Sequence, residues 1–184
     1  MARIKPVTNP QGKTLELLNG VKQTLGSTPN VFTTMGNSPA VLDAFLKFSQ
    51  SLNATSISGK LREQIALAIA GQNSCQYCAS AHTLLGKKAG VPELELTLNL
   101  EGSSKDPKTN AAIKFAKAVS AKRGKVSNEE LKEIRNAGYS DGEIAEIVAT
   151  VVLNIFTNYF NLVAETDVDF PVIQLPNNAN LAKV

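Results

Sequence analysis

Apolar residues recur every three or four positions along most of the chain, which is the spacing of one face of an α-helix. This spacing predicts helical segments over about 13–25, 29–36, 38–53, 58–71, 75–88, 92–100, 110–122, 127–138 and 140–165. No segment alternates strongly enough between apolar and polar residues to require a sheet. We therefore expect an all-α, single-domain helical bundle of about seven to nine helices.

Residues typical of helix ends punctuate these segments. Ser127 with Glu130, and Ser140 with Glu143, fit the capping-box pattern that begins a helix. Ser74 is the expected N-cap of the helix that holds both cysteines of the chain. The helical boundaries are thus indicated locally, by side chains that satisfy free backbone groups.

Two helices carry unusually broad apolar surfaces. In the segment 38–53 a wide stripe that includes Val41 and Phe48 is expected to face the core. The segment 140–165 is apolar on most of its circumference, so we expect it to be central or shared with another subunit. Polar residues such as Glu146 and Asn154 interrupt it before the roughly 18 apolar residues of a membrane span are reached.

The two ends of the chain read differently from its middle. Pro6 and Pro10 predict an extended arm over about 1–11, and Pro171 and Pro176 predict a second over about 167–184. We expect one domain over 1–184 that forms a homo-oligomer, a dimer, trimer or hexamer, through the last helix and the arms. The N-terminus lacks the apolar stretch of a signal peptide, so we expect a cytoplasmic protein without a membrane anchor.

Charge and composition narrow the function classes. The net charge is +3, and the 19 basic and 16 acidic residues are interspersed, which does not favour nucleic-acid binding. A chain of 184 residues buries enough surface to fold without a disulfide scaffold. The two cysteines are therefore not needed to stabilise the fold by a disulfide, and their presence has another reason.

The cysteines stand in a Cys-x-x-Cys pair, Cys75 and Cys78. In a reducing compartment such a pair is kept for its reactivity or for a metal. Structural zinc takes four ligands, and with His82 as the one histidine even Glu63 would complete an unusual set. We therefore expect no metal and no other cofactor, while inert burial of the cysteines stays an alternative.

Four residues form a constellation with meaningful spacings, Glu63-x11-Cys75-x2-Cys78-x3-His82. A cysteine at a helix start is favoured as thiolate by free N–H groups and the helix dipole. His82 lies four residues after Cys78, on the same helical face. If the preceding helix runs antiparallel, Glu63 returns toward His82 and orients it, as a third group orients a base beside a nucleophile.

This string resembles the active-site signature of the alkylhydroperoxidase AhpD-like proteins of the carboxymuconolactone decarboxylase family, and the similarity to their peroxidase-related branch spans about residues 27–171. The resemblance implies a thiol-dependent hydroperoxide reductase. In it Cys78 attacks the peroxide, Cys75 resolves the product, and His82 and Glu63 relay the proton. Tyr77 occupies the position of a second family histidine and is an auxiliary candidate. An external dithiol or lipoyl-type reductant is the implied partner.

Several alternatives remain open from the residues. The helix start favours Cys75 as the attacking thiol, whereas the nearby histidine favours Cys78. A disulfide reductase, or a non-catalytic redox-sensing module, would use the same pair. Asn154, Asn158 and Asn161 either line the same pocket or make hydrogen bonds between helices or subunits.

Overall fold

The computed structural model describes residues 2–176, and over this range the chain forms nine α-helices and one short 3₁₀ helix, with no β-strand. The all-α prediction is confirmed for these residues. In chain order the helices are α1 (Gly12–Leu25), α2 (Asn30–Met35), α3 (Pro39–Ser51), η1 (Leu52–Ala54), α4 (Gly59–Gln72), α5 (Gln76–Lys88), α6 (Glu93–Glu101), α7 (Pro107–Ala121), α8 (Asn128–Asn136) and α9 (Asp141–Ala164).

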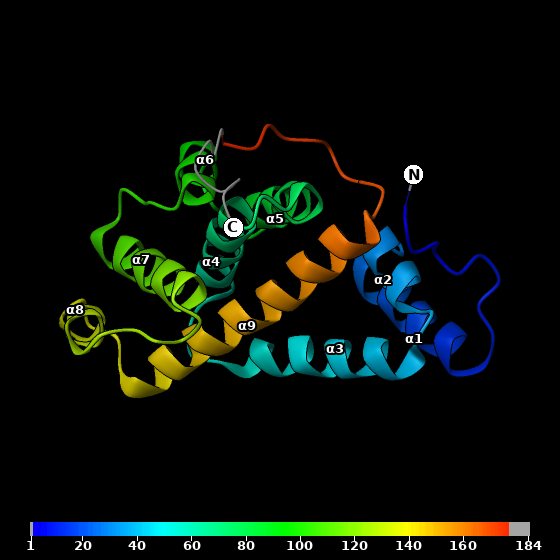
Figure 1. Cartoon of the computed structure of the whole chain (residues 1–184), viewed down its shortest axis with the longest axis horizontal. Coiled ribbons are helices and arrows are strands. Elements are labelled where there is room, and N and C mark those ends of the chain that lie inside the picture. Colours follow the sequence, from blue (N-terminus) through cyan, green and yellow to red (C-terminus); the bar gives the residue numbers. More distant parts are fainter. Residues whose placement is uncertain (1, 177–184) are drawn as a thin grey trace.

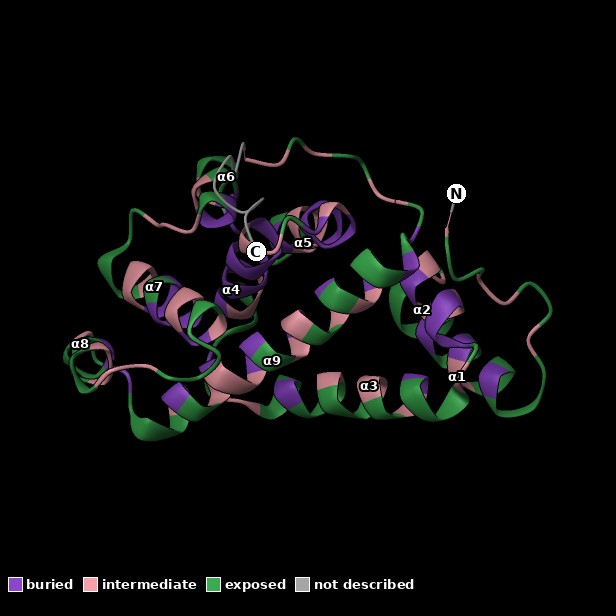
Figure 2. Ribbon diagram, viewed as in Figure 1, coloured by how far each residue is buried: buried purple, intermediate pink, exposed green. Residues whose placement is uncertain are grey.

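Helix α4 lies at the centre and packs against α5, α6, α7 and α9 (Figure 1). Most of its residues are buried, namely Leu61 and residues 64–71 (Figure 2). Small residues on α4 let its neighbours approach closely. At Gly71 an added Cβ would collide with the backbone carbonyl of Leu100, at the end of α6. The close α4–α6 packing therefore depends on the missing side chain.

The predicted helix caps are present at both capping boxes. Ser127 with Glu130 caps α8, and Ser140 with Glu143 caps α9, each pair exchanging two side-chain to backbone hydrogen bonds. Replacing such a capping serine with alanine typically costs about 1 kcal/mol of stability. These local bonds explain why the helix starts agree with the sequence pattern.

The apolar stripe of α3 differs from its prediction. Leu42 is fully buried, but Val41 and Phe48 are each 39% exposed. The expectation that the whole stripe faces the core is wrong for those two residues. The reason is that α9 runs beside α3 along one flank, where Phe45 stacks on Phe156 with ring centroids 6.0 Å apart. Helices α1 and α2 also pack against α3, and the surfaces that these three helices cover leave Val41 and Phe48 partly exposed.

Helix α9 supplies both core and surface. Ile147, Val151 and Asn158 are buried against its neighbours, whereas Tyr159 and Val163 are 56% and 63% exposed. By length and composition α9 is the one helix in the described range that is apolar enough to cross a membrane. Here it packs along α4, α7, α5 and α3 as an element of the helical domain.

Both ends of the described chain are extended and lie on the helical body. Arg3 and Ile4 donate backbone hydrogen bonds to the carbonyl of Ala164, at 2.7 and 3.3 Å. After α9 the chain turns back and runs toward α5 (orange to red in Figure 1). We call residues 165–176 the C-terminal arm. The predicted remainder of that arm, 177–184, lies outside the described residues.

Candidate active site

The cysteines lie at the junction where α4 gives way to α5. α4 ends in a Schellman motif, in which Cys75 N donates to Ala70 O at 3.0 Å and Ser74 N donates to Gly71 O at 3.2 Å. The motif places one residue in the left-handed conformation, and Ser74 occupies it with a φ of 53°. Ser74 is therefore part of the end of α4, and its predicted role as N-cap of the next helix is wrong.

Cys75 is itself the N-cap of α5. Its backbone is extended, and its sulfur accepts a hydrogen bond from Cys78 N at 3.3 Å. The first N–H groups of a helix and the positive end of its dipole stabilise negative charge at this position. Cys75 thus lies where the start of a helix stabilises a thiolate. The sequence pattern places Cys75 in the first turn of the helix, whereas in the structure it is the N-cap, one position earlier.

A disulfide joins the two sulfurs, and the Cα atoms of Cys75 and Cys78 are 5.3 Å apart. The two residues are 1% and 3% exposed. They belong to an apolar cluster with Met35, Leu42 and Leu67. A pair of thiols that bonds across one turn can give up two electrons as the disulfide forms and take them back on reduction, without a larger rearrangement of the chain.

The structure brings Glu63 and His82 together, as the antiparallel packing of α4 and α5 predicts. Glu63 Oε2 lies 2.8 Å from His82 Nδ1, and the two side chains are 23% and 21% exposed. An ionised carboxylate only accepts, so Nδ1 carries the proton and Nε2 is free to exchange one. His82 follows Cys78 by one helical turn, and within residues 2–176 no direct hydrogen bond joins its ring to either sulfur.

Tyr77 lies apart from this pair. Its hydroxyl accepts a hydrogen bond from Val31 N at 3.1 Å, and its ring meets Phe170 edge-on at 5.5 Å. Burial raises the pKa of the Tyr77 hydroxyl far above its usual value; the Val31 N–H opposes this and the nearby Asp169 carboxylate adds to it. Tyr77 is therefore a neutral anchor for α2 and the C-terminal arm, and no contact of its hydroxyl with Glu63 or His82 is found within residues 2–176.

The three asparagines of α9 separate into three roles. Asn154 donates to Thr150 O of its own helix at 2.9 Å. Asn158 accepts from Asn73, in the turn before the cysteines, at 2.9 Å. Asn161 donates from Nδ2 to the sulfur of Cys78 at 3.4 Å. The sequence pattern does not decide whether these residues line the site or make hydrogen bonds between helices. Of the three, Asn161 is the one whose side chain contacts a cysteine sulfur.

The two residues between the cysteines both hold the C-terminal arm. Gln76 Nε2 donates to Ile173 O at 2.7 Å, and Tyr77 packs on Phe170. On the body of the protein, Asn30 binds the same arm through Asp167 O and the Asp169 carboxylate, at 2.9 and 2.8 Å. The sequence predicts an extended arm but does not place it at the site, because an extended segment carries no local pattern that indicates which surface it packs on.

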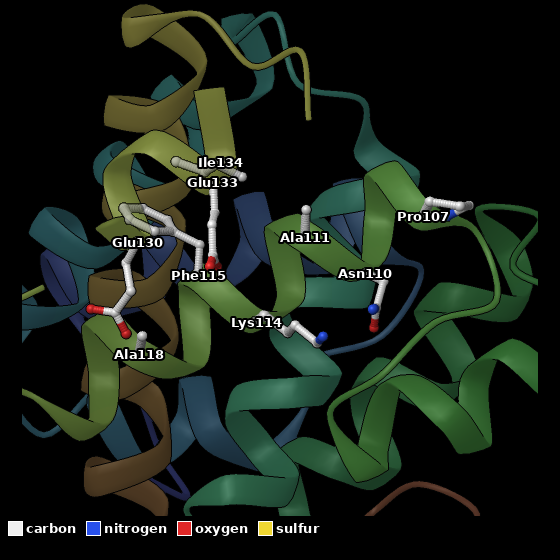
Figure 3. Close-up of a pocket in the computed structure, with 9 residues that line it drawn as sticks. All are labelled: Pro107, Asn110, Ala111, Lys114, Phe115, Ala118, Glu130, Glu133 and Ile134. Atoms are coloured by element: carbon white, nitrogen blue, oxygen red, sulfur yellow. The ribbon is translucent and has the colours of Figure 1, made fainter. Parts of the chain in front are cut away.

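Two hollows lie elsewhere on the surface. One, of about 410 Å³, opens between α7 and α8 beside Lys114 and Glu133 (Figure 3). A second, of about 690 Å³, lies near Lys60 and Tyr139. Neither is lined by a predicted site residue. Among the described residues no group of three or more His, Cys, Asp or Glu side chains is arranged to hold a metal ion.

Comparisons with known proteins agree with this fold. The model of the carboxymuconolactone decarboxylase family matches residues 39–119. A peroxidase-related protein from Silicibacter sp. TM1040 is 21% identical, with a TM-score of 0.78 over 90% of this chain and 89% of its own. A peroxidase-related protein from Ralstonia eutropha JMP134, described as an alkylhydroperoxidase AhpD core, is 20% identical, with a TM-score of 0.80 over 90% and 93%.

A third similar structure belongs to a protein with another activity. The debrominase Bmp8 is 24% identical, with a TM-score of 0.77 over 91% of this chain and 92% of its own. No relative is found among curated protein sequences. The family segment 39–119 contains all five predicted site residues, whereas Asn161 and the C-terminal arm lie beyond it. Residues 39–119 are thus similar to the carboxymuconolactone decarboxylase family, and the chain has the helical fold of the AhpD-like proteins.

Proposed function

We propose that the protein is a thiol-dependent hydroperoxide reductase whose redox pair is Cys75 and Cys78. The observation that carries the proposal is the disulfide at the start of α5, with His82 one turn further along the same helix and paired with Glu63 of α4. A dithiol that cycles through this disulfide transfers two electrons, which is the requirement for reducing a peroxide bond. The fold shared with AhpD-like proteins supports the same reading.

The reaction begins with the reduced pair. The thiolate of Cys78 attacks the distal oxygen of the hydroperoxide, the O–O bond breaks, and the alkoxide leaves with a proton as an alcohol. Cys78 is then a sulfenic acid. The thiol of Cys75 displaces its hydroxyl as water, and the disulfide forms. An external dithiol of the lipoyl type reduces this disulfide, becomes a disulfide itself, and restores both thiols.

His82 and Glu63 handle protons in this scheme. His82 takes the proton from the attacking thiol and returns one to the leaving oxygen, through Nε2. Glu63 holds Nδ1 and stabilises the imidazolium that forms between these two transfers. Because both side chains are partly exposed, protons can exchange with solvent after each cycle.

A coupled assay tests the proposal. The protein is mixed with dihydrolipoamide and either cumene hydroperoxide or hydrogen peroxide, and peroxide loss is followed over many equivalents. We expect repeated turnover above the rate of the dithiol alone. Consumption of one equivalent followed by arrest indicates a redox sensor. Reduction of a model disulfide without any effect of peroxide indicates a disulfide reductase.

A second candidate is reductive removal of bromine from an aromatic ring. It is favoured by the shared fold with the debrominase Bmp8, a variant of which is described in complex with 2,3,4-tribromopyrrole. The same dithiol would supply two electrons, so that a C–Br bond becomes C–H, bromide leaves, and Cys75 and Cys78 form their disulfide. Bromide release from tribromopyrrole, measured beside the peroxide assay, decides between the two.

We also propose that the protein acts as a homo-oligomer in the cytoplasm. Four apolar residues of α9 share one face at spacings of four, three and four positions and are 40–63% exposed: Val152, Phe156, Tyr159 and Val163. Phe156 stacks on Phe45, so this α9 face continues onto α3. A monomer rarely leaves such a stripe in water. A second copy, with the same stripe, is the partner that matches it.

Light scattering after size-exclusion chromatography checks the oligomer. We expect the wild-type mass to be a multiple of the 19.6 kDa chain. Val152→Lys combined with Val163→Glu places charges on the α9 face, which should shift the population toward the monomer. Leu94→Lys, at a 53% exposed apolar residue on α6, is the matched control and should leave the mass unchanged. A monomeric wild type at micromolar concentration contradicts the prediction.

A further inference from the structure

Asn161 has an unusual hydrogen-bonding state beside the redox pair. Its amide donates to the Cys78 sulfur at 3.4 Å, and both residues are at least 95% buried, at 5% and 3% exposed. Its other polar atom, Oδ1, is buried and has no hydrogen-bond partner among the described residues. A buried acceptor without a partner is costly, and packing alone would be better served there by leucine.

A second hydrogen bond between α9 and the α4–α5 junction fixes the position of Asn161. One helical turn earlier, Asn158 is fully buried and accepts from Asn73 in the turn that precedes Cys75. The C-terminal end of α9 is therefore fixed to both ends of the α4–α5 junction. This arrangement holds the Asn161 amide on the sulfur rather than leaving it free to rotate away.

We propose that Asn161 is a positioning residue that holds the Cys78 sulfur and stabilises its thiolate. Each sulfur then has its own N–H donor. The start of α5 provides one for Cys75, and Asn161 provides one for Cys78, which lies beyond the helix start. Hydrogen bonds to an ionised acceptor are stronger than those to a neutral one, so this donor favours the ionised form. The inference deepens the proposed function, because it identifies what prepares the attacking sulfur.

The test measures thiol ionisation and needs no peroxide. In a Cys75→Ser background, with Cys78 as the single thiol, the rate of alkylation by iodoacetamide is measured against pH. Asn161→Leu removes the donor at similar volume, and we expect the midpoint of the profile to rise by about one pH unit, or about tenfold slower alkylation near neutrality. Asn161→Asp, which keeps the shape and adds a like charge, should raise the midpoint further.

Asn154→Leu is the matched control. Asn154 lies two turns earlier on the same helix, is equally buried at 5% exposed, and donates only to its own helix, so its loss should not move the midpoint. If Asn161→Leu does not fold, Asn161→Ala, which also removes the donor and adds no charge, is measured in its place. In the wild-type protein, the Asn161 side-chain amide signal in NMR should also move as the thiol ionises. An unchanged midpoint in a folded Asn161 variant overturns the proposal.

The outcome is independent of the substrate. A shifted profile in a protein that consumes no peroxide leaves the role of Asn161 intact and removes the proposed function. An unshifted profile in an active peroxidase does the reverse.

A different set of contacts supports a second inference, that the C-terminal arm restrains access to the disulfide. The arm is anchored to Gln76 and Tyr77, the two residues between the cysteines, and to Asn30 on α2. Four of its apolar side chains pack against the cluster that contains both cysteines: Val168, Phe170, Ile173 and Leu175. We infer that the arm is a strap that must loosen before a reductant reaches the sulfurs.

The rate at which a phosphine reduces the disulfide tests the strap. Phe170→Ala removes an anchor from the arm, and Asn30→Ala removes one from the body. We expect each to accelerate reduction by about tenfold, because the open arm becomes more populated. Val172→Ala alters the same arm at a residue that is 70% exposed, and it should reduce at the wild-type rate. Wild-type rates in both anchor variants overturn the strap.

Discussion

Replacing Cys78 with Ser is expected to lower peroxide turnover to the level of the reaction without protein. A serine hydroxyl cannot form a sulfenic acid or a disulfide, so neither electron transfer can occur. The loss should be complete rather than partial, because His82 and Glu63 assist a thiol and have no redox chemistry of their own. Steady-state peroxide consumption with dihydrolipoamide measures the effect.

Cys75→Ser is the paired variant and separates the roles of the two sulfurs. It should also stop turnover, but it should leave one oxidising equivalent on Cys78, because no second thiol can resolve the sulfenic acid. Dimedone labelling followed by peptide mass spectrometry detects that species. A stable dimedone adduct on Cys75 in the Cys78→Ser protein, with none on Cys78 in the Cys75→Ser protein, would show that the attacking thiol is Cys75.

Gly71→Ala is expected to destabilise the fold by about 2 kcal/mol or more, although alanine is the better helix former. The added methyl group would collide with the Leu100 carbonyl, which is backbone and cannot rotate away. Relief requires α4 and α6 to separate in the centre of the core. Because Gly71 also accepts from Ser74 in the turn before the cysteines, the change should disturb the site as well. Urea unfolding measures the loss.

Gly20→Ala is expected to change the free energy of unfolding in the opposite direction and serves as the control. Gly20 lies inside α1, is exposed, and has open space where a Cβ would be. Alanine there should raise stability by about 0.5–1 kcal/mol through helix propensity alone. Equal effects of the two changes would contradict a steric role for Gly71.

The helices of this chain could be predicted largely because their signals are local. Ser127 with Glu130 and Ser140 with Glu143 satisfy the first backbone groups of their own helices, so a few residues suffice to place α8 and α9. The Glu63–His82 pair was predictable for a related reason. Two helices joined by a short turn pack antiparallel, and spacing then decides which side chains meet.

The errors arise where distant parts of the chain decide. The sequence predicts Ser74 at the start of α5. In the structure Ser74 belongs to the Schellman motif that ends α4, because only a short turn separates the two helices. The sequence predicts that Val41 is buried, but the stripe on α3 is wider than the surface that α1, α2 and α9 cover. Asn161 reaches Cys78 across 83 positions of sequence, and no local pattern encodes such a contact.

The central claim is that Cys75 and Cys78 reduce a hydroperoxide by passing from two thiols to one disulfide. Its most direct test is to add one equivalent of cumene hydroperoxide to the fully reduced protein under anaerobic conditions and to analyse the products by mass spectrometry. The account predicts one alcohol and one Cys75–Cys78 disulfide per peroxide, formed far faster than with free cysteine. Both thiols intact at the end of that time, with the peroxide unreacted, would contradict it.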